Sequence, residues 1–530
     1  MSLAVLMEIA GLETADVCRE LSIDQLTLDD WLSGAKSPPQ YLLRAIEVMS
    51  QISGGESQIS MPSFDGKRAP DSDTPTLVSL FSGGGGLDIG LERAGFKTVV
   101  ANEIEKHACK TLKANKRLAM IEAADFDQWF LNTVAIQRCY RSYGPDDLER
   151  LMARIRPVLK SDTRLLADAH ILERDIRELS ADFILEATGL GVGMVDLIAG
   201  GPPCQPFSRA GKQQTVDCDD GRLFLEFVRL VDRLRPRWFL FENVKGLVQH
   251  RTEALYSTCR HCLVSRPVSF GLRSSVTSLD DAIDKCAECG KTDTITPHWE
   301  KRRGGSLDMI EAEFCRLGYT CQSRVLNARD FGVPQDRERL FIIGSRDGER
   351  FDWPSPTHGE NQSIRSLFEA APLLPYVSMR DALYQEGHWR YGQLSDDAVV
   401  WVKNVVRPHD EPVTWSLDRV SPTVGAHQAA KLAIAPFGVP AAQLARQQWH
   451  TLGRRQSDSP PVFVEHEYLS DQELLKLQTF PSHWYLHGTR LERAFQIGNA
   501  VPPDLAEAVG GAILKAMSGG QVEARHEVVL

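Results

Sequence analysis

Short apolar runs, each bounded by glycine or polar turn residues, recur along the chain and predict buried strands. The run at 76–81 (TLVSLF) leads into the glycine turn SGGGG and then into LDIGLERAG, whose apolar residues suit a packed helix. Further runs follow at 97–101, 195–199 and 238–241. Strands that alternate with helical segments in this way favour an α/β fold.

The first part of the chain has a different pattern. Residues 1–51 contain short apolar stretches with helical spacing, and the succession of short helix, turn and Trp-bearing helix in 12–32 resembles a helix-turn-helix. A plain helical docking domain explains this pattern nearly as well, and Asp29 with Asp30 weakens the case for DNA binding. Residues 52–75 are rich in Gly, Ser, Pro and Asp and are expected to be a flexible linker.

Composition narrows the class of protein. With 530 residues, 42% of them hydrophobic, the chain is expected to form about three or four structural units. No run approaches the roughly 18 apolar residues of a membrane span, and the N-terminus has no basic lead of a secretory signal. We therefore expect a cytoplasmic protein. The net charge of −11 does not exclude nucleic-acid binding, because binding depends on where the charge lies.

The glycine turn after 76–81 is a candidate nucleotide-type site. Glycines allow the tight turn and let a ligand approach main-chain amides at the start of a helix. Glu103 follows the next strand, about twenty residues on, where a carboxylate can accept hydrogen bonds from ribose hydroxyls. Asp175 is a candidate acceptor for an adenine amino group. A flexible surface turn and a solvated loop aspartate remain the alternatives for the glycines and for Asp175.

Cys204 and Glu242 are candidate reactive groups. Each follows a predicted buried strand, at 195–199 and 238–241, and the carboxyl ends of parallel strands meet at one edge of a sheet. A lone cysteine is more often a small buried hydrophobic residue. A glycine-bounded loop that carries Cys204 and several polar side chains could close over phosphates.

Taken together and in order, these motifs resemble those of the DNA cytosine-5 methyltransferase family, of the bacterial restriction-modification type. The motifs are FSGGGG, Glu103, Asp175, PPCQPFS, ENV, VLNARDFGVPQDRERLFIIG, LQTFPSHW and QIGNAVPP. The resemblance implies a Rossmann-like S-adenosylmethionine-dependent methyltransferase core with a mixed, mostly parallel sheet, at 76–349 and again at 466–520. It also implies double-stranded DNA as the partner, S-adenosyl-L-methionine as the cofactor and a location at the bacterial nucleoid.

The resemblance assigns roles to four residues. Cys204 matches the nucleophile that adds to C6 of cytosine, which activates C5 for methylation. Glu242 matches the carboxylate that holds and protonates N3, and Arg339 matches the donor to O2. Arg337 would support the site or the approach of Cys204, and positive neighbours of this kind would favour the thiolate. The target base must first be flipped out of the duplex.

The same resemblance predicts the cofactor pocket. The lining residues are Phe81, Gly83, Gly85, Glu103, Asp175, Ile176, Pro203 and Asn499. One departure is visible in HEYLSDQELLKLQTFP, where the family usually has arginines and this chain has His466 and Lys476. This stretch is expected to be structural.

Residues 350–465 are expected to form the smaller target-recognition domain. They are rich in loops, Trp, His and Arg, and Arg407, Arg419 and the segment 421–423 are candidate DNA contacts. Solvated loop residues are the alternative for each. Residues 117–165 have a helical pattern to which we assign no function.

Four of the 11 cysteines are paired in CxxC spacing, which predicts a zinc ribbon within an insert at 250–303. Thiolates at this spacing suit tetrahedral Zn²⁺, so the predicted ligands are Cys259, Cys262, Cys286 and Cys289. A redox pair or unpaired thiols are the alternatives. The insert is expected to be structural or to add a DNA contact, helped by the basic run 301–303.

Two other functions compete with DNA methylation. An RNA cytosine-5 methyltransferase would use similar cysteine chemistry, but the large recognition region disfavours it. A DNA-binding regulator with an inactive core is disfavoured by the intact Cys204, Glu242 and Arg339. We expect a monomer with no membrane partner, and a cognate restriction endonuclease would be a functional rather than a physical partner.

Overall fold

The computed structural model describes most of the predicted core. The described residues are 74–135, 145–160, 164–203, 223–249, 251–267, 289, 295–360, 373–383, 399–402, 413–426, 433–434 and 467–519. The predicted N-terminal helices, the linker up to residue 73, and the residues Cys204, Cys286, Arg407 and His466 lie outside these ranges.

A seven-stranded sheet forms the centre of the fold. Its strand order is β3-β2-β1-β4-β5-β10-β9. The strands are β1 (Thr76–Leu80), β2 (Lys97–Glu103), β3 (His170–Glu173), β4 (Leu197–Gly200), β5 (Trp238–Val244), β9 (Thr320–Asn327) and β10 (Glu338–Ser345). Only β10 runs against its neighbours, since it is antiparallel to both β5 and β9. The sheet is therefore mixed and mostly parallel, as the sequence predicts.

The strand order changes direction between β1 and β4. From β1 the chain moves outward to β2 and β3, then returns to β4 on the other side of β1 and continues to β5. In open α/β sheets, ligands bind at the carboxyl ends of the strands where the order reverses. The glycine turn follows β1 and the Cys204 loop follows β4, so both begin at this point.

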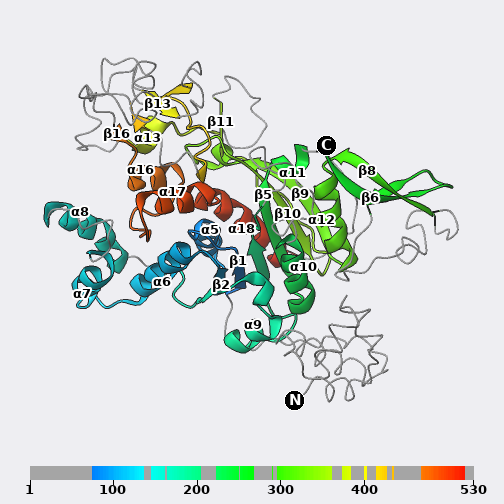
Figure 1. The fold of residues 1–530 in the computed structure, drawn as a ribbon, viewed down its shortest axis with the longest axis horizontal. Coiled ribbons are helices and arrows are strands. Elements are labelled where there is room, and N and C mark those ends of the chain that lie inside the picture. Colours follow the sequence, from blue (N-terminus) through cyan, green and yellow to red (C-terminus); the bar gives the residue numbers. More distant parts are fainter. Residues whose placement is uncertain are drawn as a thin grey trace, which may run out of the picture. The chain divides into compact units, whose positions relative to one another are not determined.

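Two apolar layers cover the two faces of the sheet. One face packs against α5 (Gly86–Ala94) and α18 (Pro503–Ser518), which lie together in Figure 1. The other packs against α10 (Leu223–Leu234) and α12 (Gly305–Arg316). Alternation along β5 divides its side chains between the faces, with Leu240 on the first and Phe239 with Phe241 on the second.

The region 117–165 is helical where it is described, as predicted. It contains α6 (Lys106–Met120), α7 (Phe126–Phe130), a π-helical turn (Leu131–Ala135), α8 (Pro145–Ile155) and a 3₁₀ turn (Arg156–Lys160). Their apolar side chains form a separate cluster that includes Tyr485 from the C-terminal region. Asn115 Nδ2 donates to the Tyr485 carbonyl at 2.7 Å, so the cluster is fixed to the core. Among the helices in the described ranges, none is long and apolar enough to cross a lipid bilayer.

A β-ribbon follows β5. After α11 (Gly246–Gln249), the strands β6 (Arg251–Cys259), β7 (Ser265–Pro267) and β8 (Ile295–Arg303) form an antiparallel sheet in the order β7-β6-β8. The chain then enters α12 directly. A further helix, α9 (Ala181–Thr188), connects β3 to β4.

The region between β10 and the C-terminal helices contains small sheets. Its elements are β11 (His358–Gly359), β12 (Leu374–Pro375), α13 (Met379–Leu383), β13 (Val399–Val402), β14 (Val413–Ser416), β15 (Ala433–Ile434) and β16 (Glu467–Tyr468). The last four strands form one sheet in the order β14-β13-β15-β16. Met379, Leu417 and Val424 share a core with α16 (Asp471–Leu477) and α17 (Arg490–Asn499).

Candidate active site

The glycine turn after β1 is held by the end of β2. Gly83 and Gly85 have φ of 55° and 89°, a left-handed backbone that glycine adopts without strain. The Gly83 N–H donates to Glu103 Oε2 at 2.7 Å. Glu103 Oε1 also accepts from the N–H groups of Ile104 at 2.8 Å and Glu105 at 2.7 Å. Burial raises the pKa of Glu103, although these three donors oppose the shift. A carboxylate has about four acceptor positions, so capacity remains for a ribose hydroxyl.

The C-terminal region closes over the same turn. Trp484 Nε1 donates to the Gly84 carbonyl at 3.0 Å, and a Cβ on Gly85 would lie 2.9 Å from the Trp484 ring. A Cβ on Gly86 would lie 2.3 Å from the Val501 carbonyl oxygen. The sequence motif LQTFPSHW does not by itself assign a role to Trp484. A buried tryptophan needs a partner for its N–H, which is the signal that could have identified this contact.

Asp175 and Ile176 lie just after β3. Asp175 caps a 3₁₀ turn (Ile176–Glu178), and Ile176 is buried. Arg177 donates to both carboxylate oxygens, with Nε–Oδ1 of 3.0 Å and Nη2–Oδ2 of 2.6 Å. Through these hydrogen bonds Arg177 lowers the pKa of Asp175. Asp175 is therefore an ionised acceptor that is already engaged, and Arg177 was not anticipated from the sequence.

Three other predicted cofactor residues surround this edge of the sheet. Phe81 follows β1 with φ of 56°, an uncommon conformation for a residue with a Cβ. Pro203 follows β4, and Asn499 ends α17. Both Pro203 and Asn499 are exposed, as residues that line an open pocket would be.

Glu242 is a buried carboxylate within β5, only 8% exposed. Its Oε1 lies 2.9 Å from Arg339 Nε on the neighbouring strand β10. Burial raises the pKa of Glu242, whereas Arg339 and then Arg337 oppose the shift. Because burial is the largest cause, the carboxyl group is suited to hold a proton at higher pH than an exposed glutamate.

The chain segment that leads to Cys204 packs on Glu242. A Cβ on Gly201 would lie 2.5 Å from Glu242 Oε2, so only glycine fits there without a shift. Asn243 Nδ2 donates to the Pro202 carbonyl at 3.2 Å. The described chain reaches Pro203, the residue before Cys204. The structure therefore places the start of the cysteine loop directly beside the carboxylate.

Arg337 makes contacts of a different kind from those of Arg339. It is fully buried, and its guanidinium donates to the carbonyls of Val424 at 3.0 Å, Gly498 at 2.8 Å and Ala500 at 2.8 Å. Gln335 Oε1 accepts from the Val424 N–H at 2.8 Å. These contacts join the start of β10 to the segment 413–426 and to the end of α17. They could not be read from sequence spacing, because the partners are distant in the chain.

Two of the three residues in the segment 421–423 form hydrogen bonds with the loop before β10. Ser421 is buried, and its backbone N–H donates to the Pro334 carbonyl at 2.9 Å. Thr423 Oγ1 donates to the Asp336 carbonyl at 2.7 Å. Arg419 is exposed and borders a cavity of about 500 Å³ between this segment and the loop before β10. Because it is exposed, Arg419 remains a candidate DNA contact. The Ser421 side chain is buried and is no longer a candidate.

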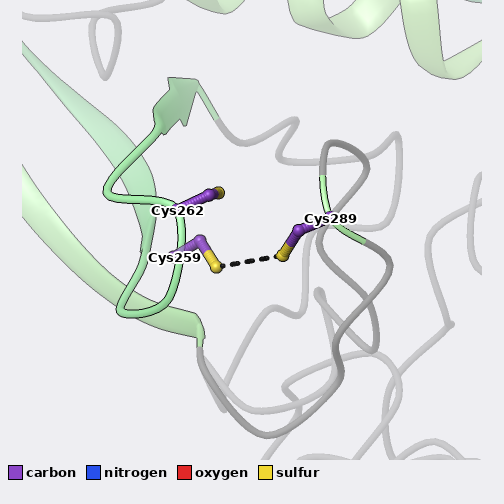
Figure 2. Close-up of side chains that lie close together, drawn as sticks. All are labelled: Cys259, Cys262 and Cys289. Carbon is purple, nitrogen blue, oxygen red and sulfur yellow. Dashed lines mark hydrogen bonds between the residues drawn. The ribbon is translucent and has the colours of Figure 1, made fainter.

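Three of the four predicted metal ligands lie together (Figure 2). The Sγ atoms of Cys259, Cys262 and Cys289 all lie within 4.8 Å of one another. The Cys259 and Cys289 Sγ atoms are 3.6 Å apart. Tetrahedral Zn²⁺ with Zn–S bonds of about 2.3 Å requires sulfur atoms roughly 3.8 Å apart, so the three thiols fit such a site. Cys286, the fourth, is outside the described residues.

Solved structures resemble the chain only loosely. A putative DNA modification methyltransferase from an Escherichia coli prophage covers 84% of this chain and all of its own length, with a TM-score of 0.42 and 19% identity. The Dnmt2 methyltransferase of S. pombe gives a TM-score of 0.43 at 14% identity, over 84% of this chain and all of its own. The assignment of the fold rests instead on the strand order and the family match.

Curated relatives share more identical residues with this chain than these two structures do. The Type II methyltransferase M.AquIA of a Picosynechococcus strain is 31% identical over 309 residues, which are 58% of this chain and 87% of the relative. M1.HphI of Haemophilus parahaemolyticus is 28% identical over 83% of this chain and 87% of its own length. M.PspPI of a Psychrobacter strain is 26% identical over 95% of this chain and 96% of its own length.

The family model for the C-5 cytosine-specific DNA methylase matches residues 76–132, 170–263 and 299–515. These segments make up more than half of the chain and include the glycine turn, the Cys204 loop, Glu242 and the arginines of β10. The unmatched interval 133–169 lies between α7 and β3 in the chain, and the interval 264–298 lies between the end of β6 and the middle of β8. The chain therefore belongs to the family of C-5 cytosine-specific DNA methylases, and DNA cytosine-5 methylation is the activity that this membership supports.

Proposed function

We propose that this protein transfers a methyl group from S-adenosyl-L-methionine to C5 of a flipped cytosine within a specific sequence of double-stranded DNA. The observation that carries the proposal is the buried Glu242–Arg339 pair, at 2.9 Å, beside the segment that leads to Cys204. Cytosine is a poor carbon nucleophile. Addition of the Cys204 thiolate to C6 makes C5 reactive, and later loss of the C5 proton and of the thiolate restores the aromatic ring.

Glu242 and Arg339 would each stabilise the charge that develops on the cytosine ring in this reaction. A Glu242 carboxyl that holds its proton donates to N3 of the base, which neutralises the charge that develops during thiolate addition. Arg339 is fixed beside it and donates to O2. Arg337 acts as a positioning residue, because its hydrogen bonds to the carbonyls of Gly498 and Ala500 hold the start of β10 against the segment 498–500.

The cofactor site would be formed by the predicted residues around the switch point of the sheet. Glu103 would hold the ribose hydroxyls and Asp175 the adenine amino group, with Ile176 and Phe81 as apolar walls. Gly83 and Gly85 would let the cofactor approach the backbone, and Pro203 and Asn499 would lie near the methionine part. When bound, the cofactor supplies an electrophilic methyl group on a sulfonium.

Substrate class can be tested with purified protein. Tritiated S-adenosyl-L-methionine is incubated with plasmid DNA or with total RNA, and the nucleosides are identified by mass spectrometry. The proposal requires 5-methyldeoxycytidine in the DNA and no 5-methylcytidine in the RNA. The reverse pattern would establish the RNA alternative.

A substitution at Gly201 provides a prediction about the geometry of the site. The Gly201→Ala variant should fold and bind the cofactor but lose roughly 10- to 100-fold in the rate of methyl transfer, because its Cβ would displace Glu242 or the cysteine loop by a fraction of an ångström or more. The rate is measured in a single turnover with saturating cofactor. The matched control is Gly511→Ala on α18, where an added Cβ meets nothing within 4 Å. Equal rates for both variants would refute the proposed contact.

We also propose a structural Zn²⁺ bound by Cys259, Cys262, Cys286 and Cys289. Support comes from the distances between three of the thiols and from the preference of Zn²⁺ for such ligands. Purified protein should contain about one Zn²⁺ per chain, and chelation should lower its melting temperature, because the metal closes the end of the ribbon.

Metal analysis of two variants tests the zinc assignment. Cys262→Ser should lose most of the bound metal, whereas Cys315→Ser, an exposed thiol outside the cluster, should retain it. Protein that binds no Zn²⁺ after expression in zinc-supplemented medium would contradict the assignment.

For the remaining parts of the chain we propose roles only for whole domains. Residues 350–465 would form the target-recognition domain, and 1–51 a helix-turn-helix-like domain joined by the linker 52–75. By analogy with the Type II methyltransferases, a cognate restriction endonuclease would act on the same sequence. We propose a monomer that acts on chromosomal DNA in the nucleoid.

A further inference from the structure

The β6–β8 ribbon has one face that is anchored to the core. The two strands pair from Arg251↔Arg303 to Cys259↔Ile295. Ser306 Oγ on α12 donates to Thr252 Oγ1 at 2.9 Å, and the buried Tyr256 donates its hydroxyl hydrogen to Asp308. Thr252 and Tyr256 therefore face α12. Figure 1 shows both strands beside α11 and α12.

The opposite face carries Arg251, Lys301 and Arg303 at the base of the ribbon, and Glu253 is the residue opposite Lys301 in the strand register. Because side chains alternate along a strand, Arg251 points away from the α12 side, as do its partner Arg303 and Lys301 two residues before it. All three are exposed. By contrast, Arg302 lies over the Tyr256 ring at 5.3 Å, on the anchored face.

The Arg251–Arg303 pair is unfavourable without a nearby anion. Like charges directly opposite each other in a strand pair destabilise the pair, and Arg251 is opposite Arg303. Neighbouring side chains on one face are about 5 Å apart across the strands and about 7 Å apart along a strand. Three basic positions and one acidic position give this part of the face a net positive charge, in a chain with a net charge of −11, and such a surface suits a phosphate backbone.

The patch is also close to the candidate active site in the fold. Arg251 follows β5 and α11, and β5 carries Glu242 near its carboxyl end. Arg303 immediately precedes Gly304, which caps α12. The cations therefore lie at the base of the ribbon near the catalytic edge of the sheet, whereas the cysteine cluster lies at the other end of β6.

We propose that Arg251, Lys301 and Arg303 form a phosphate-binding surface that contacts the DNA backbone outside the target cytosine. The inference rests on the proposed function, since it takes DNA as the partner. Phosphate contacts carry no sequence information but fix the position of the protein on the duplex. The ribbon would therefore set affinity and register, while the recognition region reads the bases.

Salt dependence of DNA binding tests this surface. Binding of a fluorescent 40-base-pair duplex of mixed sequence is measured by anisotropy over a series of KCl concentrations. Each phosphate contact contributes about 0.9 to the slope of log affinity against log salt concentration. The triple variant R251Q/K301Q/R303Q should therefore bind with a slope that is smaller by about 2 to 3. The double variant R251Q/K301Q should lose about 2.

A control with equal loss of charge separates this effect from net charge. The variant R117Q/R164Q/R350Q removes three exposed cations that lie on α6, before β3 and after β10, away from the ribbon. It should keep the wild-type slope. In methyl transfer to plasmid DNA, the ribbon variants should raise the KM for DNA and leave kcat unchanged.

The outcomes distinguish two kinds of failure. Wild-type protein that methylates DNA, with ribbon variants that share its slope and KM, would overturn the surface and leave the proposed function intact. Wild-type protein that transfers no methyl group to DNA would overturn the proposed function, and the surface with it. An equal fall in slope for the control variant would show an effect of net charge and would likewise refute the surface.

Discussion

The Cys204→Ser variant is expected to lose methyl transfer by on the order of 10⁴-fold or more, in line with the loss when a covalent nucleophile is removed. A serine hydroxyl is not ionised near neutral pH, and it is a much weaker nucleophile than a thiolate. Cofactor binding should persist, because the contacts of Glu103 and the glycine turn do not involve Cys204. The measurements are single-turnover methyl transfer and calorimetric binding of S-adenosyl-L-methionine.

Cys315→Ser is the control for general thiol effects, since Cys315 is an exposed cysteine on α12. A covalent complex with duplex DNA that contains 5-fluorocytosine should form with this control and not with Cys204→Ser, because fluorine at C5 blocks the final elimination. A Cys204→Ser enzyme with activity within about tenfold of wild type, a difference of only 1.4 kcal/mol in barrier height, would contradict covalent catalysis by this residue.

Glu242→Gln is expected to slow the chemical step by about 10²- to 10⁴-fold, the usual contribution of a general acid. Glutamine keeps the shape of the side chain but has no proton to transfer to N3, and it removes the negative partner of Arg339 at 2.9 Å. Binding of the cofactor should change little. Rates are measured in single turnover at several pH values, since the wild-type dependence on the raised pKa of Glu242 should disappear in the variant.

The control for Glu242→Gln is a second buried glutamate that forms an ion pair. Glu313 on α12 is 1% exposed and lies 3.2 Å from Arg316 Nε. Glu313→Gln should affect stability more than catalysis. If both variants lost catalytic rate to the same degree, the effect of Glu242 would be due to a general change in packing, and its assignment as the acid would be wrong.

The central strands could be predicted because their residues are largely apolar. The runs at 97–101 and 238–241 correspond to β2 and β5, and both strands extend further to include Glu103 and Glu242. The sequence pattern alone predicts that each strand ends before its glutamate. In the fold, backbone N–H groups satisfy Glu103 and Arg339 satisfies Glu242, so a polar side chain can remain within the strand.

Other parts of the site depended on contacts between distant segments. Arg337 could be assigned to the site only by resemblance, since its carbonyl partners lie at 424, 498 and 500. The contact of Trp484 with Gly84 spans 400 positions in the chain. Periodicity and spacing describe local structure, so neither contact could be derived from them. The CxxC pairs predicted a contact between distant segments, because their spacing is typical of cysteines that bind one Zn²⁺. Three of the four cysteines do lie together.

DNA cytosine-5 methylation by Cys204 is tested most directly by base-resolution 5-methylcytosine sequencing of DNA from a methylation-deficient bacterium that expresses the wild-type chain or its Cys204→Ser variant. Cytosine within one short sequence should be methylated throughout the genome with the wild-type chain, and nowhere with the variant. If folded, cofactor-binding wild-type protein produced no more methylation than the variant, DNA cytosine-5 methylation by Cys204 would be contradicted.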